Sequence, residues 1–167
     1  MIQEDYLMRM IESLGAIARK LIHKTQSPAD FKDGVLDVRS KSKDLLGVDC
    51  AVLVEVSDET LVTMFTVEFD YAHAVKCLLA ASLLNVQAQF QMADGESEPA
   101  QNGFRKALLL SMQALLMENA LRTVENHEQI RLLMEKVSES EIPYALLPKL
   151  YLYQRIAGYD LRRQVKP

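Results

Sequence analysis

Cysteine and glycine are scarce in this 167-residue sequence, and their scarcity excludes several kinds of site. Only Cys50 and Cys77 are present, and their separation matches no spacing of zinc ligands. Without a secretory context, we expect both thiols to be reduced and mostly buried. The six glycines form neither a glycine-rich phosphate loop nor a hairpin turn, so neither a phosphate site nor a β-hairpin is expected.

The sequence also lacks an apolar run long enough to cross a bilayer. Its most apolar stretch, CLLAASLLNV (residues 77–86), is interrupted by Ser82 and Asn85. It falls short of the roughly 20 residues that a membrane-spanning helix needs. The acidic residues Glu4, Asp5 and Glu12 do not fit the apolar region of a signal peptide. We therefore expect a soluble, cytoplasmic protein without a membrane partner.

An excess of positive charge is missing as well. The net charge is −4 and the isoelectric point about 5.4, so a nucleic-acid partner is not expected. Only the stretch from Lys149 onward is basic, with five basic residues and one acidic residue, and a short basic tail is typically solvated. Hydrophobic residues make up 49% and charged residues 25%, which is typical of a folded chain. We expect residues 1–167 to form a single domain.

Helical periodicity dominates the first part of the chain. Apolar residues recur at three- and four-residue steps over residues 3–25, which predicts an amphipathic helix. Ser27 and Pro28 are typical of a helix start, and Gly47 is typical of a helix end, so a second helix is predicted between them. Residues 48–56 favour a strand by composition, but a lone strand has no partner here, so a short helical turn is preferred. Ser57 is expected to cap a helix that runs to about Phe69.

The second half of the chain predicts longer helices. One helix is expected over Asp70–Ala93, and another from near Pro99 to Thr123. A further helix is predicted over Glu125–Glu139, and Pro143 is expected to open the last one. The predicted fold is all-α, with about six to seven helices in antiparallel pairs.

Small and aromatic residues around Gly95 are spaced as in a helical repeat. Tetratricopeptide arrays pair helices at a period of about 34 residues and need small residues where the two helices cross. With Gly95 at the turn, we expect Ala100 and Ala107 to lie at such a crossing, with Phe104 between them. A helical bundle can space these residues in the same way, so this window alone leaves both architectures open.

The beginning of the chain resembles a known family. MIQEDYLMRMIESL (residues 1–14), LLGVD (residues 45–49) and VSDETL (residues 56–61) are similar to a bacterial family of tetratricopeptide-like helical proteins of unknown function. The resemblance implies a tetratricopeptide-like fold. Because the family has no assigned activity, it implies no site.

Few residues are arranged for chemistry. Asp70, His73 and Cys77 share one helix face, but three ligands on one helix do not complete a tetrahedral metal site, and we interpret them as a half-buried face. The stretch ENHEQ brings His127 close to two acids, which favour a helix start in any case. No nucleophile stands beside a histidine. We therefore predict no enzyme, no cofactor and no metal.

Tyrosine and arginine near the C-terminus suggest a partner-binding surface. These residue types are enriched at interfaces, although packing at the edge of the core explains them too. The candidate residues are Tyr144, Leu150, Tyr151, Tyr153 and Arg155.

The last helix also suggests self-association. A terminal repeat helix leaves an apolar face bare unless that face packs back or meets a second copy, and we prefer a homodimer. The face would include Leu146, Leu150, Tyr153 and Ile156 or Ala157. The predicted function is a helical-repeat module that binds a protein or peptide. The alternative is a regulatory domain that holds a small ligand between helices.

Overall fold

The computed structural model describes residues 27–137 and 146–164, together with Asp5, Met8, Arg9, Glu12 and Gly15. Within this part of the chain there are seven α-helices and one 3-10 helix and no strand, so the all-α prediction is confirmed there. The predicted start of a helix at Pro143, and nearly all of the predicted helix over residues 3–25, lie outside the described residues. The elements are α2 (Pro28–Leu46), α3 (Cys50–Glu55), α4 (Asp58–Phe65), α5 (Tyr71–Ala93), α6 (Ser97–Met117), η1 (Asn119–Leu121), α7 (Val124–Lys136) and α8 (Leu147–Gln164).

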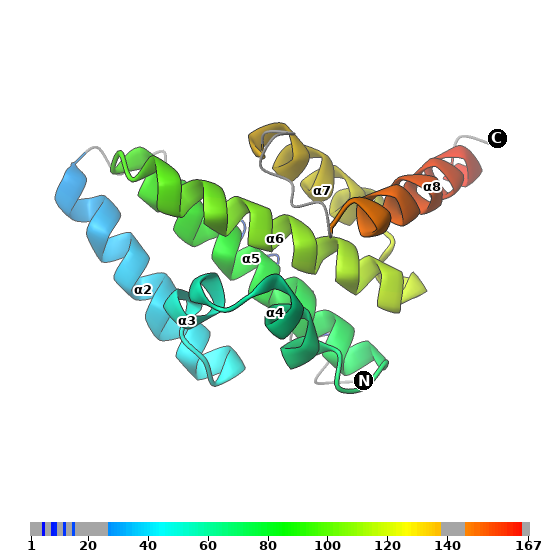
Figure 1. The fold of residues 1–167 in the computed structure, drawn as a ribbon, viewed down its shortest axis with the longest axis horizontal. Helices are drawn as coiled ribbons and strands as arrows, with labels where there is room; N and C mark the ends of the chain where they lie inside the picture. Colours follow the sequence, from blue (N-terminus) through cyan, green and yellow to red (C-terminus); the bar gives the residue numbers. More distant parts are fainter. Residues whose placement is uncertain are drawn as a thin grey trace.

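Helices α5 and α6 lie side by side at the centre of the molecule (Figure 1). Asp70 caps α5, because its Oδ1 accepts a hydrogen bond from the backbone N–H of His73 at 2.8 Å. Helices α2, α3, α4 and α6 all pack against α5, which explains why apolar residues cover most of its surface. The chain reverses at Gly95, whose φ of 86° lies in the left-handed region that favours glycine. The helix predicted over Asp70–Ala93 is confirmed, with Asp70 as its cap.

Small residues allow α5 and α6 to approach closely. A Cβ atom added to Gly103 would lie 3.0 Å from Ala88 Cβ and 3.6 Å from the carbonyl oxygen of Leu84. Ala100 and Ala107, one turn to either side of Gly103, are both fully buried. Their predicted burial in the α5–α6 layer is confirmed, while the tight contact itself involves Gly103.

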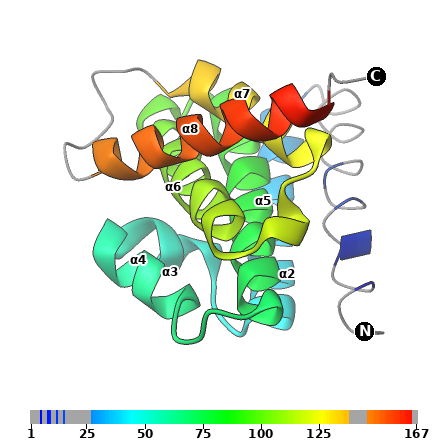
Figure 2. The ribbon, with the colours of Figure 1, turned by 90° about the vertical axis from the view of Figure 1, so that its right-hand side faces the viewer.

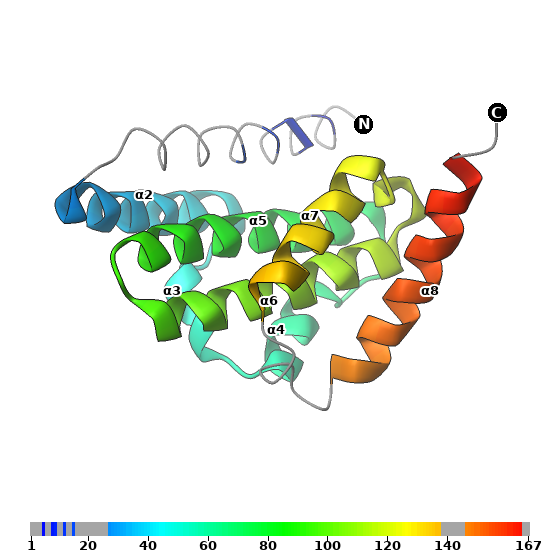
Figure 3. The same cartoon turned by 90° about the horizontal axis from the view of Figure 1, so that it is seen from above.

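Helix α2 packs along α5 on the other side (Figure 3). Ser27 and Gly47 end it as predicted: Ser27 Oγ accepts from the N–H of Asp30, and Gly47 has a φ of 72°. In its middle, Gly34 faces the buried ring of Phe90. A Cβ atom at this position would lie 2.6 Å from the nearest ring carbon, so the backbone of α2 itself forms the contact.

The ambiguous segment after α2 is helical, as predicted. Asp49 caps α3 through the N–H of Ala51 at 2.9 Å, and Cys50 and Leu53 insert into the core. Ser57 caps α4 through the N–H of Thr60, as expected. However, α4 ends at Phe65 and not at Phe69, and residues 66–70 form a bent connection to the start of α5.

Two other predicted ends are wrong. Helix α6 was predicted to reach Thr123, but it ends at Met117. The backbone of Glu118 is extended, and its Oε1 accepts a hydrogen bond from the N–H of Ala120, which starts η1. Arg122 then donates from Nε to the carbonyl of Leu115 at 2.8 Å and covers the exposed end of α6. Helix α7 ends at Lys136, short of the predicted Glu139.

Helices α7 and α8 complete the described part of the molecule. Both pack against α6, and α8 runs across one end of the α5–α6 pair (Figure 2). Helix α8 begins at Leu147, with Pro148 in its first turn, where a missing N–H costs nothing.

Candidate functional site

The inner face of α8 is covered by the rest of the molecule. Leu146 and Tyr153 are buried, and Leu150, Ile156 and Ala157 are half-buried. The sequence left two ways to cover this face, and the structure shows the one in which it packs back on the domain, not the contact with a second copy that was preferred. Helix α8 folds back on α6 and α7, so the apolar surface of these residues is removed from water within one chain.

A buried histidine joins α7 to this inner face. His127 Nδ1 lies 2.8 Å from the hydroxyl of Tyr153, and His127 Nε2 lies 3.2 Å from Asp160 Oδ2. Because the carboxylate can only accept, Nε2 donates to Asp160; in the neutral imidazole Nδ1 then accepts from the tyrosine hydroxyl. Burial and the charge of Asp160 raise the pKa of Tyr153 to about 12, so its hydroxyl stays protonated as a donor.

This arrangement corrects one sequence interpretation and agrees with another. Tyr153 belongs to the helix–helix contact and is not available to a partner. His127 turns inward, while Glu125 is exposed and Glu128 pairs with Arg131 on the surface. ENHEQ therefore does not bring an acid and a base together for chemistry.

Helix α8 has more exposed large apolar side chains than any other helix in the described part of the chain, and we call the surface that carries them its outer face. Tyr151 is 61% exposed, Leu152 52% and Leu147 42%. The guanidinium of Arg155 lies 6.0 Å from the centre of the Tyr151 ring, at the outer limit of a cation–π contact. Of the predicted partner-binding residues, Tyr151 and Arg155 lie together on this face, Leu150 is half-buried, and Tyr144 is outside the described residues.

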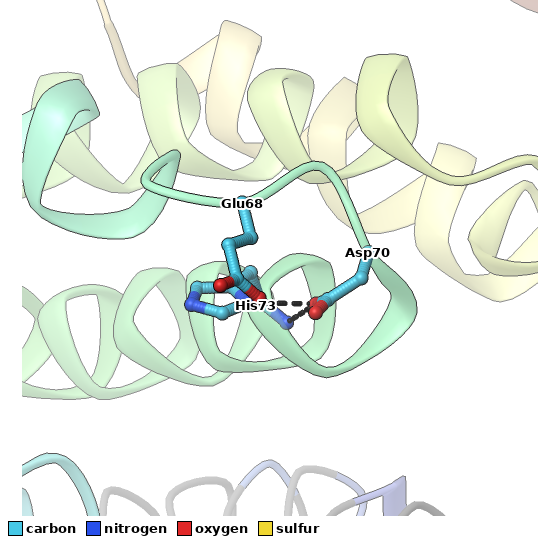
Figure 4. Close-up of side chains that lie close together, drawn as sticks. All are labelled: Glu68, Asp70 and His73. Carbon is cyan, nitrogen blue, oxygen red and sulfur yellow. Dashed lines mark hydrogen bonds and ion pairs between the residues drawn. The ribbon is translucent and has the colours of Figure 1, made fainter.

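Of the candidate metal residues of the sequence, Cys77 lies apart from the other two, which Figure 4 shows beside Glu68. Cys77 points into the core and donates to the carbonyl of Leu110 at 3.2 Å, and burial raises its pKa to about 12. Asp70 and His73 stay together, and Glu68 joins them, with ligand atoms within 4.8 Å of one another. Asp70 Oδ1 already accepts from the backbone N–H and from the ring Nδ1 of His73, at 2.8 and 2.7 Å.

The geometry of this cluster fits a helix cap better than a metal site. The hydrogen bonds to Asp70 lower its pKa, and the carboxylate interacts favourably with the positive end of the α5 dipole. A cation bound there would compete with both hydrogen bonds and meet the unfavourable end of the dipole.

A second polar cluster fixes the connection between α3 and α4 to α6. Asp58 Oδ2 accepts from Arg105 Nη1 at 2.5 Å, and its Oδ1 lies 3.3 Å from Lys106 Nζ. Lys106 is almost fully buried, donates to the carbonyl of Val56, and has a pKa lowered by burial. Together with Asn102 these residues line an open cleft of about 370 Å³. Because Asp58 and the carbonyl already satisfy the two cations, we interpret the cluster as a structural clamp.

A cavity of about 360 Å³ lies between α5, α6 and α7. Lys136 lies at its edge, with Nζ 4.8 Å from the centre of the Phe104 ring. Burial lowers the pKa of Lys136. The sequence did not lead us to expect a buried lysine at Lys106 or at Lys136. Lys106 had a local signal, because it falls on the apolar side of α6 between Gly103 and Leu110, whereas Lys136 had none.

The fold and these surfaces define an all-α protein with one exposed apolar helix face and a small cavity between helices. None of the helices that the structure describes has both the length and the hydropathy of a membrane-spanning segment. Comparisons with models of protein families, with curated proteins and with solved structures find no match to this chain. The function is therefore inferred from the geometry of the described residues.

Proposed function

We propose that this chain is a non-enzymatic, tetratricopeptide-like module that binds an acidic protein segment with an apolar anchor through the outer face of α8. The carrying observation is the exposure of Tyr151, Leu152 and Leu147 beside Arg155. Exposed aromatic residues next to arginine are typical of interface centres.

The charge of this region supports an acidic partner. Helix α8 lies in the basic C-terminal stretch of an otherwise acidic chain, and Arg155 and Arg162 are exposed on it. An acidic segment would be attracted to this helix, and its apolar side chains would cover Tyr151 and Leu152.

The tetratricopeptide-like part of the proposal is supported by the α5–α6 pair. Two long helices joined by a short turn at Gly95 pack closely through Gly103 and Ala88, as the repeat pattern requires.

The non-enzymatic part is supported by the state of the candidate nucleophiles. Burial raises the pKa of Cys50 to about 11 and of Cys77 to about 12, so neither thiol is a thiolate at neutral pH. His127 is bound on both ring nitrogens, and His73 is bound to Asp70 through Nδ1.

A site-specific crosslinking experiment tests this function. A photoreactive phenylalanine analogue at position 151 should capture a partner in cells, and the same analogue in place of Leu36 on α2, which is 58% exposed, should not. Binding of the purified partner should weaken about tenfold or more with Tyr151→Ala and with Arg155→Ala.

Equal capture from both positions would show non-specific contact and contradict the proposal. A partner whose affinity is unchanged by both substitutions would place the interface elsewhere.

A further inference from the structure

A second surface of the molecule has features that the proposed interaction does not use. Helix α7 lies across α6 (Figure 3). The volume of the cavity between α5, α6 and α7 is within the range of small-molecule sites. Its described lining consists of Gln89, Met92 and Ala93 from α5, Gln101 and Phe104 from α6, and Lys136 from α7.

The positive charge at this cavity has no anion within the part of the chain that the structure describes. Among the described residues, no carboxylate forms an ion pair with Lys136, whose contact is the face of the Phe104 ring. A partly buried ammonium without a counter-ion is unfavourable, and a ring quadrupole replaces only part of its hydration. By contrast, the buried Lys106 is paired with Asp58. The site is therefore complementary to one negative charge.

A buried acceptor at the same cavity also has no donor. Gln101 Oε1 is buried and accepts no hydrogen bond from the described residues. Leaving such a group unpaired typically costs about 1–3 kcal/mol, which a ligand hydroxyl or N–H would recover. Between these polar groups the lining is apolar, formed by Met92, Ala93 and Phe104.

We propose that the cavity binds a small organic monocarboxylate with an apolar body and one hydroxyl or N–H donor. Its carboxylate pairs with Lys136, its apolar body packs on Phe104 and Met92, and its donor pairs with Gln101 Oε1 once the amide turns toward the cavity. A nucleotide does not fit this chemistry, because several phosphate charges would meet one lysine. A divalent cation does not fit either, because the described lining provides no carboxylate.

The test uses 4-hydroxyphenylacetate, which has all three features, and two analogues that each lack one. The neutral 4-hydroxyphenylacetamide lacks the charge, and phenylacetate lacks the hydroxyl. Titrations of the ¹⁵N-labelled full chain should shift amide resonances around the cavity, with a Kd on the order of 1 mM for a ligand of this size. Each analogue should bind several-fold more weakly.

Matched variants assign the binding to the named residues. Lys136→Met should weaken binding of 4-hydroxyphenylacetate about tenfold, while Lys76→Met, at an exposed lysine of α5, should leave it unchanged. Gln101→Leu should reverse the order of the two acids, so that phenylacetate binds better. Thermal melts of each variant check that the fold is retained.

Three results would overturn the inference. The first is equal affinity for the acid and the amide, the second is an unchanged affinity in Lys136→Met, and the third is the absence of shifts with any probe at about 10 mM. None of these results bears on the outer face of α8, so the two proposals can fail independently.

Discussion

Gly34 lets the backbone of α2 contact the ring of Phe90 directly. Three ring carbons lie 2.6 to 2.8 Å from the place where a Cβ atom would stand, and the ring is only 1% exposed. A buried ring cannot move aside without disturbing its neighbours, because protein interiors are closely packed. At this position packing outweighs helix propensity, which by itself favours alanine over glycine by about 1 kcal/mol.

We therefore predict that Gly34→Ala lowers the free energy of unfolding by about 1–3 kcal/mol. Gly158 in α8 provides the control, because an added Cβ would meet only the flexible end of Arg162 at 3.7 Å. Gly158→Ala should be neutral or stabilising by up to about 1 kcal/mol. Urea unfolding of both variants measures these changes in the free energy of unfolding. A Gly34→Ala protein as stable as the parent would mean that the α2–α5 contact is looser than described.

The pH dependence of stability should include a contribution from Asp49. Its carboxylate is bound by Arg39 at 2.9 Å and by the N–H of Ala51, and these contacts hold its pKa well below the ordinary value of 3.8. A lowered pKa in the folded state gives stability that is present above pH 3.8 and is lost as the pH falls below it.

Replacing this carboxylate by an amide isolates the charge, because asparagine still caps a helix. Asp49→Asn should be less stable than the parent by up to about 1 kcal/mol at pH 7, since Arg39 is partly exposed and screened by solvent. The difference should shrink progressively as the pH falls below 3.8. Urea unfolding at pH 7 and pH 3 measures it. A difference that stays constant across this range would contradict the assigned pKa shift.

At the scale of elements, the α5–α6 layer depends on small residues along one face of α6. Gly103 approaches Ala88, and Ala107, one turn further on, is fully buried. Extra volume there must push two central helices apart, since α5 is held from its other side by α2.

Ala107→Leu should therefore lower the free energy of unfolding by about 1–3 kcal/mol through overpacking. Ala29→Leu, at an exposed position of α2, is the matched control and should change it by no more than about 0.5 kcal/mol. Thermal unfolding monitored by circular dichroism measures the stability of both variants against the parent. If Ala107→Leu melts like the parent, the helices do not cross at this position.

The attachment of α8 depends on the buried His127. Removing the hydroxyl in Tyr153→Phe leaves His127 Nδ1 buried without a donor, which should cost about 1–3 kcal/mol. The loss should be local, so hydrogen–deuterium exchange should increase in α8 more than in α2. Tyr151→Phe, on the exposed side of the same helix, should change neither the free energy of unfolding nor the exchange rate in α8. Uniform faster exchange throughout the chain would contradict a local role.

At the scale of the whole molecule, self-association must use the outer face of α8 if it uses this helix at all. The inner face is covered within one chain, whereas Leu147, Tyr151 and Leu152 remain exposed. The C-terminal stretch is basic and the rest of the chain acidic, so two copies can offer each other complementary charge.

On this basis we predict a homodimer at tens of micromolar that Tyr151→Glu with Leu152→Glu converts to a monomer. Leu36→Glu on α2 places the same charge at another exposed apolar position and should leave the dimer intact. Light scattering coupled to size-exclusion chromatography gives the masses. A monomeric parent would exclude this dimer and leave the face to the acidic partner proposed above.

Part of this structure follows from local signals, and those predictions are confirmed. Ser27 and Ser57 cap helices where expected, because a cap needs only a side-chain oxygen and the next few N–H groups. The end of α6 was not predicted, because Glu118 and Arg122 have no strong turn signal and act through contacts that exist only once the chain has turned back.

The candidate sites were also predicted only in part from the sequence. The composition of the last helix indicated a partner surface, but periodicity does not say which face of an amphipathic helix is covered. Tyr153 is buried and Tyr151 exposed because α6 and α7 supply the neighbours on one side. The cavity at Lys136 needs residues from three helices, and no spacing along one helix could predict it.

By itself, then, the sequence determined the helical class, most helix starts and the turn at Gly95, because these depend on interactions within a few residues. Only the tertiary structure decided which faces meet. It turned His127 inward, separated Cys77 from His73, and placed Lys136 at a cavity against the Phe104 ring, without an anion among the described residues. The physical reason is that burial and charge pairing depend on neighbours far apart in the chain, which packing alone brings together.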